Sequence, residues 1–273
     1  MENIIIRNLF RLVKAGSFGE KTEDIEPMSA FKWKKLFHIV EAQQLVWNFN
    51  EGVNQCKEQP GCNVPLSLLS ECQPEQRYEL HNFRKMTADL RLDVPILNKR
   101  LHAIINGEIH AIDTSVETMT MLAIIVDTLN DMLNQGMIIR GVANLGHYLR
   151  TKGDKTDFEK LDLWLGKLTL RRMARLQGSI LVELFDFTPD EIPFLNRIEP
   201  SARRLAIRSL HHSQHDTTED WHFRQDSTGL IRNNNAALRR NLRRSFSYLN
   251  YAPIETIGNF VTKFARSLSE IEE

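Results

Sequence analysis

The segment from Val116 to Leu133 is apolar almost all the way round in its middle, where Met121–Val126 form an unbroken apolar run. A surface helix carries one apolar stripe, whereas a helix that is apolar on most faces must be surrounded by other elements. The run is far shorter than the roughly 20 apolar residues that a membrane-spanning helix needs. The segment therefore predicts a central helix inside a helical bundle.

Three helix starts, that of the central helix included, are marked by capping-box patterns, in which a threonine hydroxyl and a carboxylate three residues later satisfy exposed backbone N–H groups. The pairs are Thr114 with Glu117, Thr156 with Glu159, and Thr188 with Glu191. Helix ends are expected at Gly136 and Gly153, because glycine readily adopts the left-handed conformation that closes a helix.

Elsewhere apolar residues recur every three or four positions, as in Met173, Leu176, Ile180 and Leu184, which is the period of a half-buried helix. Alternating strand patterns joined by Asn-Gly or Asp-Gly turns are lacking. We therefore predict an all-α fold, an irregular multi-helix bundle of about nine to eleven helices. Residues 1–273 are assigned to a single helical domain, with 1–196 as the bundle and 197–273 as a sub-region of arginine-rich C-terminal helices.

Loops are expected at residues 16–28, 55–74 and 211–230 because these stretches interrupt the helical period. The second loop holds all three cysteines, Cys56, Cys62 and Cys72, whose spacing fits no zinc knuckle. We interpret them as reduced thiols. The start of the chain, "MENIIIRNLF", lacks the basic region and cleavage site of a signal peptide, so a cytoplasmic protein is expected.

The stretch "SLHHSQHDTTEDWHF", residues 209–223, is the strongest candidate for a metal site. His211 and His215 are four residues apart, and Asp220 or His222 could complete a ligand set. Zinc ligands, however, need a second shell that fixes each ring, and this polar segment offers no rigid apolar frame. We therefore favour an exposed loop, and we expect no metal or other cofactor.

Lysines plus arginines and aspartates plus glutamates number 35 each, so the formal charge is zero and a general attraction to polyanions is not expected. A local exception is the stretch from residue 200 to residue 250, which contains nine arginines, four carboxylates and no lysine. Four of these arginines form a basic ridge with i,i+4 spacing: Arg239, Arg240, Arg243 and Arg244. Arginine forks suit phosphate, but a solvated helix face is the favoured interpretation.

The stretch "GSFGEKTEDIE" places Gly16-Ser17 ahead of Asp24-Ile25-Glu26. Nucleotidyltransferases hold Mg²⁺ with a similar Gly-Ser element followed by a carboxylate–apolar–carboxylate strand. Here the spacer is only six residues, and the preceding "LFRLVKA" has a helical pattern. A working metal site is therefore not expected, and Gly16 and Gly19 are interpreted as the end of the first helix.

Residues 136–195 contain Arg140 with "LGHYLR", then "DKTDFEKLDLWL", then "FTPDEIPF". Together with "IIRNLFRLVKAGSFGE" and "FKWKKLFHIVEAQQLVWNFNEGV" in the N-terminal part and "YAPIETIGNFVTKFARSLSEIEE" at the end, these pieces resemble the helical regions of a bacterial family of uncharacterised nucleotidyltransferase-like proteins. The resemblance covers about half of the chain. It implies a shared helical frame in which the last piece is the final helix.

The same resemblance exposes a missing part. Members of that family carry a catalytic core between the helical regions, with a lysine–glycine strand and an aspartate–isoleucine–aspartate strand. Residues 75–135 contain neither, and Glu108 and Asp113 lie five apart, which does not match the two-residue period of a strand. No catalytic residue can therefore be carried over.

The sequence thus favours a non-catalytic helical interaction or scaffold protein, acting on an unknown protein partner or as a homo-oligomer and not on a membrane. One alternative is a diverged nucleotidyl- or phosphoryl-transfer enzyme with an unrecognised site. The other is a binder of nucleic acid or another polyanion through the ridge at residues 239–244.

Overall fold

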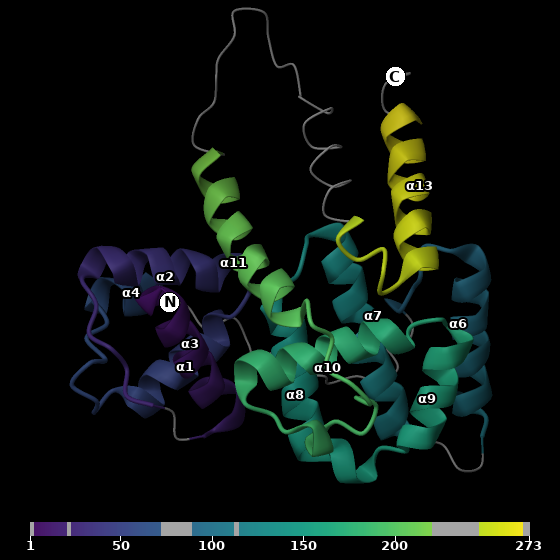
Figure 1. Ribbon diagram of the computed structural model, residues 1–273, viewed down its shortest axis with the longest axis horizontal. Helices are drawn as coiled ribbons and strands as arrows, with labels where there is room; N and C mark the ends of the chain where they lie inside the picture. Colours follow the sequence, from purple (N-terminus) through teal and green to yellow (C-terminus); the bar gives the residue numbers. More distant parts are fainter. Residues whose placement is uncertain (1–2, 21–22, 72–88, 112–114, 220–245, 270–273) are drawn as a thin grey trace, which may run out of the picture.

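A computed structural model of the chain describes residues 3–20, 23–71, 89–111, 115–219 and 246–269 (Figure 1). Within these ranges the secondary structure consists of eleven α-helices and two short 3-10 helices, with no strand. This confirms the predicted all-α, multi-helix fold. The α-helices are α1 (Ile4–Phe18), α2 (Ala30–Ala42), α3 (Val46–Cys56), α4 (Leu66–Glu71), α6 (Pro95–Ile109), α7 (Val116–Asn134), α8 (Ile139–Lys152), α9 (Phe158–Lys167), α10 (Arg171–Phe185), α11 (Ala202–Glu219) and α13 (Pro253–Ser269). The 3-10 helices are η1 (Gly153–Lys155) and η2 (Pro189–Glu191).

Helix α7 is the central helix that the sequence predicted. It contacts α8, α9 and α10, and Met121, Leu122, Ala123, Ile125 and Val126 are completely buried. Apolar side chains on every side of a helix stabilise the fold only when other elements enclose them and remove them from water. No helix in the part of the chain that is described has the length and apolar character to cross a bilayer.

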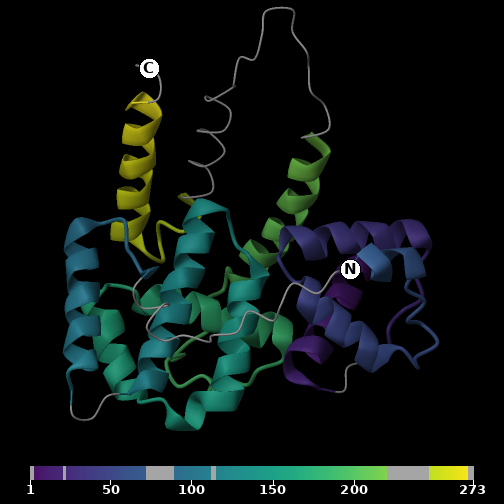
Figure 2. The ribbon, with the colours of Figure 1, turned by 180° about the vertical axis from the view of Figure 1, so that it is seen from behind.

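Helices α1–α4 lie together at one end of the molecule and α6–α10 at the other, as both views show (Figures 1 and 2). Helix α1 contacts α8 and α10, and α11 contacts both α10 and α2, so these two helices join the two groups. A single connected apolar core runs from Ile5 to Ala252. The boundaries of the predicted sub-regions, 1–196 and 197–273, stay a prediction.

Helix α13 and the second half of α11 both extend beyond this body, on the same side (Figures 1 and 2). The loop predicted over residues 211–230 is therefore wrong for residues 211–219, which continue α11. The sequence pattern failed here because a polar stretch is compatible with a helix that runs out into solvent as well as with a loop.

Two of the three predicted capping boxes are displaced by one residue. Ser115 caps α7 and Asp157 caps α9, where the Asp157 carboxylate accepts the Lys160 N–H at 2.9 Å. Thr156, the predicted cap, instead donates to the Lys152 carbonyl at 3.1 Å and closes the preceding turn. A carboxylate also suits the positive end of the helix dipole better than a hydroxyl does.

The third capping box and the glycine stops are confirmed. Thr188 and Glu191 form the expected reciprocal box at η2. Gly136 has a positive φ of 92° two residues after α7 ends at Asn134. Gly153 follows α8 directly, with a right-handed φ of −55°, and begins η1. Gly19 ends α1 with a φ of 70°.

The prediction that Gly16 ends α1 is wrong. Gly16 lies within α1, at the point where this helix crosses α3. A Cβ atom on Gly16 would come 1.8 Å from the Asn48 carbonyl oxygen, and one on Gly52 would come 2.0 Å from the Leu12 carbonyl oxygen. The two helices therefore pack backbone against backbone, which only glycine permits. The sequence could not distinguish this role from a helix stop because it does not show which helix crosses at this position.

We predict that Gly16→Ala lowers the free energy of unfolding by about 3 kcal/mol, because backbone atoms cannot yield to the added methyl group. Gly107→Ala in α6 is the matched control, since a Cβ atom there meets nothing within 4 Å. The control should raise stability by about 0.5–1 kcal/mol through the higher helix propensity of alanine. Urea unfolding measures both, and equal effects of the two changes would contradict the close crossing.

Candidate functional site

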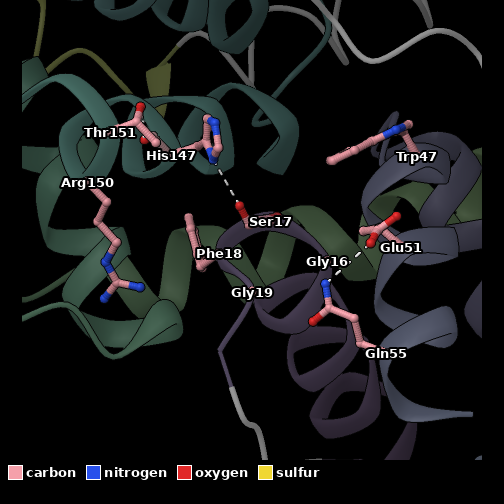
Figure 3. Close-up of a pocket in the computed structure, with 10 residues that line it drawn as sticks. All are labelled: Gly16, Ser17, Phe18, Gly19, Trp47, Glu51, Gln55, His147, Arg150 and Thr151. Carbon is pink, nitrogen blue, oxygen red and sulfur yellow. Dashed lines mark hydrogen bonds between the residues drawn. The ribbon is translucent and has the colours of Figure 1, made fainter.

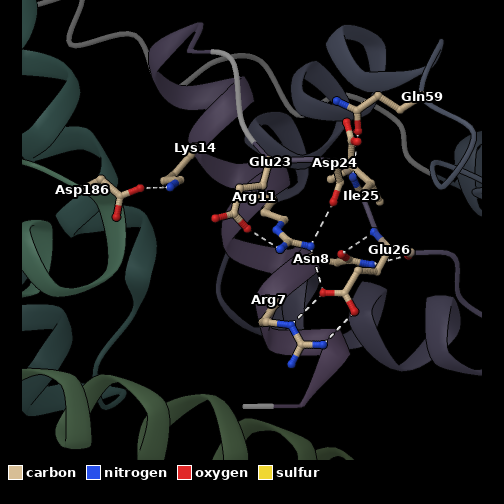
Figure 4. Close-up of polar contacts among 10 residues, drawn as sticks. All are labelled: Arg7, Asn8, Arg11, Lys14, Glu23, Asp24, Ile25, Glu26, Gln59 and Asp186. Carbon is tan, nitrogen blue, oxygen red and sulfur yellow. Dashed lines mark hydrogen bonds and ion pairs between the residues drawn. The ribbon is translucent and has the colours of Figure 1, made fainter. Parts of the chain in front are cut away.

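The segment Asp24-Ile25-Glu26, whose pattern is similar to a nucleotidyltransferase element, is bound to α1 by hydrogen bonds and ion pairs (Figure 4). We call the contacts of Glu26 with Arg7, Asn8 and Arg11 the Glu26 clamp. The Glu26 carboxylate accepts two hydrogen bonds of 2.7 Å from Arg7 and one of 2.9 Å from Arg11. Asn8 exchanges a pair of hydrogen bonds with the backbone of Glu26, at 2.7 and 3.1 Å. The hydrogen bonds from Arg7, followed by the charges of Arg7 and Arg11, lower the pKa of Glu26 to about 2 against the opposing effect of burial.

Ile25 is buried beside this clamp, and its N–H donates to the Gln59 side chain at 2.8 Å. Residues 23–26 are therefore fixed against α1 and the turn that follows α3, and they form no strand. Since two guanidinium groups already hold the Glu26 carboxylate, it serves the structure as an ion-pair partner and is not presented to a cation.

A cavity of about 450 Å³ opens where the end of α1 meets α3 and α8 (Figure 3). His147 Nδ1 donates to the Ser17 carbonyl oxygen at 3.0 Å, and the Ser17 hydroxyl accepts from Asn48 at 2.8 Å. Histidine and serine thus meet through a backbone carbonyl and not through the hydroxyl, so they do not form a nucleophile–base pair.

Arg150, at the rim of the same cavity, is engaged by side chains of the protein. Its guanidinium pairs with Glu20 and, at 3.0 Å, with Glu191. It also lies over the rings of Phe18 and Phe187, with its central carbon 5.0 and 3.8 Å from their centroids. The cavity therefore presents an arginine that already has two carboxylate partners.

Paired carboxylates occur on α7, where Asp127 and Asp131 are one turn apart. Burial, followed by the neighbouring charge of Asp131, raises the pKa of Asp127 to about 6. Burial also raises the pKa of Asp131, against the effect of Arg140, which lies 3.7 Å from it. Among the residues with a described placement, no group of three or more histidines, cysteines or acids could hold a metal ion.

The site residues predicted from sequence lie at or beyond the end of α11. His211 and His215 belong to that helix, while Asp220 and His222 are outside the described residues. The ridge of Arg239, Arg240, Arg243 and Arg244 is outside them as well. The metal site and the polyanion site therefore stay predictions.

Helix α13 is attached to the body through its polar side chains. Glu255 accepts hydrogen bonds from the backbone N–H groups of Asp93 and of Val94, the latter at 3.4 Å. Asn259 donates to Asp93 and, at 3.0 Å, to the Asn134 side chain, and Lys263 donates to the Leu133 carbonyl at 2.9 Å. Glu255 and Asn259 are almost completely buried, and burial raises the pKa of the Glu255 carboxyl against the effect of the backbone donors.

Gly258 allows this close attachment. A Cβ atom at Gly258 would come 2.3 Å from the Val94 side chain. The helix therefore settles directly on the segment that leads into α6, and its orientation about its own axis is fixed by side-chain contacts on one face.

The opposite face of α13 is apolar and exposed. Ile254, Ile257, Val261 and Phe264 are 45%, 55%, 56% and 42% exposed. We call these four residues the α13 stripe. Their spacing of three and four residues places them along one line of the helix, and the ring of Phe260 stacks on that of Phe264 with centroids 6.0 Å apart. The helix is thus amphipathic in the reverse sense of a core helix, with polar residues inward and apolar residues outward.

Sequence reasoning missed this face. The resemblance pointed to a final helix at these residues but assigned no site to it. The signal was present in the three- and four-residue spacing of the stripe, although that spacing alone is equally typical of a helix that turns its apolar face to the core.

Comparison of the chain with models of protein families, with curated proteins and with solved structures finds no match. The resemblance to nucleotidyltransferase-like proteins therefore stays a prediction. Among the described residues, the exposed α13 stripe is the surface feature that bears most directly on function.

We predict that Asp127→Asn stabilises the protein at pH 8 by about 1–2 kcal/mol and has little effect near pH 4. The folded-state pKa of about 6 lies above the ordinary value of 3.8, so the contribution of Asp127 to stability is complete below the ordinary value. It is lost as the pH rises through 6 and the buried carboxyl ionises. Asparagine cannot ionise and avoids that loss.

Urea unfolding of both proteins at pH 4, 6 and 8 measures the effect. The exposed Asp154 offers a control position, since Asp154→Asn should change the free energy of unfolding by less than about 0.5 kcal/mol. An Asp127→Asn variant whose stability relative to the wild type does not change with pH would contradict the buried, ionising carboxyl.

Proposed function

We propose that this protein is a non-catalytic helical interaction protein, a scaffold whose binding surface is the α13 stripe. The observation that carries the proposal is the reversed amphipathicity of α13. Single exposed apolar residues are common on protein surfaces, whereas a contiguous row of large ones marks a contact surface.

The free energy involved supports a contact of this kind. Burying one large aliphatic or aromatic side chain completely is worth about 1.5–3 kcal/mol. The four residues of the stripe are about half exposed, so covering each of them would gain roughly 1 kcal/mol. A helix that presents its apolar line in this way is the typical ligand of a groove or of another helix.

Fixed orientation strengthens the argument. Glu255, Asn259 and Lys263 hold the helix by hydrogen bonds on its inner face. The stripe is therefore presented in one direction before a partner arrives, which reduces the entropy lost on binding.

Within the described ranges of the chain, no comparable observation supports the alternative of a diverged nucleotidyl- or phosphoryl-transfer enzyme. Such an enzyme needs acidic side chains that converge where a metal and a triphosphate fit. The Glu26 carboxylate is instead paired with Arg7 and Arg11. Asp127 has Asp131 as an acidic neighbour, but the positive charge of Arg140 acts on the same carboxylate.

Affinity capture from the native host with the wild type and with the double variant Ile257→Asp/Val261→Asp tests the proposal. We expect the double variant to lose the proteins that the wild type captures, copies of the chain itself included, because two charges would be buried at the contact. Phe31→Asp is the matched control, since Phe31 is 67% exposed in α2, at the other end of the molecule from α6 (Figures 1 and 2).

Circular dichroism and thermal unfolding should show that all three proteins are folded. The control should capture the same proteins as the wild type. Capture that is equal for the wild type and the double variant would refute the α13 stripe as the binding surface.

A further inference from the structure

We propose that the occupant of the α13 stripe is a second copy of this chain, so that two α13 helices pair along their stripes as a short coiled coil. This inference rests on the proposed function and names its partner. Its first support is the spacing of the stripe, whose residues alternate by three, four and three positions.

That alternation is the a/d pattern of a heptad repeat. Ile254 and Val261 occupy a positions, and Ile257 and Phe264 occupy d positions. In the sequence the same alternation continues at Leu268 and Ile271. A helix with an apolar period of 3.5 residues fits a second helix of the same period, because each side chain inserts between four residues of its partner. A copy of the chain supplies such a helix without any further requirement.

The charges around the stripe are compatible with self-association. Along residues 253–267 the positions that flank the a/d seam are Pro253, Gly258, Phe260, Ala265 and Ser267, and none carries a charge; the first charged flanking position is Glu272, beside Ile271. Two identical helices with like charges at these positions would repel one another. The nearest charged side chains, Glu255 and Lys263, point to the body, where they bind Asp93 and Leu133.

In the part of the fold that is described, the stripe is exposed. Helix α13 extends beyond the body, with its far end away from the other described helices (Figures 1 and 2). The inner face of the helix is already occupied by the polar contacts at Asp93, Asn134 and Leu133. Val94 packs against Gly258 on one flank of the stripe, so a second copy would approach from the flank of Phe260, where none of these contacts is displaced.

The pairing is expected to depend on concentration. A seam of a few a/d layers buries less area than the interfaces of permanent dimers, so the complex belongs with the weaker, reversible ones. Sedimentation velocity of the full chain over a roughly hundredfold range of concentration should show the mass rising from that of one chain toward twice that value.

Three variants make the measurement specific to the stripe. Ile257→Asp/Val261→Asp should sediment as a single chain over the whole range, with the concentration at half-association raised by more than tenfold. Val261→Leu should still associate, because leucine retains an apolar side chain at the seam. Thr262→Asp, at an exposed position one residue from the stripe, should associate like the wild type.

A wild type that stays a single chain at every concentration would overturn the self-association. In that case, capture of another protein that the double variant loses would leave the proposed function standing, and the absence of any such capture would overturn both. A single-chain wild type that melts at a higher temperature than the double variant would also overturn it, since the stripe would then be covered within the chain.

Discussion

The hydrogen bonds that attach α13 to the body determine which side of that helix meets the solvent. Glu255 and Asn259 are buried polar side chains, and such groups cost free energy unless partners satisfy them. Asp93, Val94 and Asn134 provide partners for the Glu255 carboxylate and the Asn259 NH2 group, from the segment before α6 and from the end of α7. Because the polar face is used for attachment, the apolar stripe is left outside, and the proposed interaction follows from that orientation.

Much of the fold could be predicted from the sequence, because its central helix has an unambiguous pattern. Residues 116–134 bury apolar side chains on all sides, and the stops at Gly136 and Gly153 lie where expected. Gly16 could not be assigned correctly, since the reason for a glycine there is the Asn48 carbonyl of another helix. Residues 211–219 were wrongly predicted as a loop, because polar residues accompany both loops and helices that project into solvent.

The candidate site was harder to predict for a related reason. A three- and four-residue apolar spacing indicates that a helix has an apolar face, but it does not indicate whether the body takes that face or the other. For α13 the choice depends on Asp93 and Asn134, which are distant in sequence from Asn259. The sequence contains a clearer signal for the clamp around Glu26, since Arg7 and Arg11 are four residues apart on α1 and face the same side.

The reversed orientation of α13 is tested most directly by comparing Val261→Asn with Asn259→Val in urea unfolding, at a concentration at which the wild type is a single chain. A core helix would lose stability when its valine becomes polar. For α13 we predict the opposite order: Val261→Asn should change the free energy of unfolding by less than about 0.5 kcal/mol. Asn259→Val should lower it by about 2 kcal/mol, because Asp93 and Asn134 lose their donor. A larger loss at Val261 than at Asn259 would contradict the account.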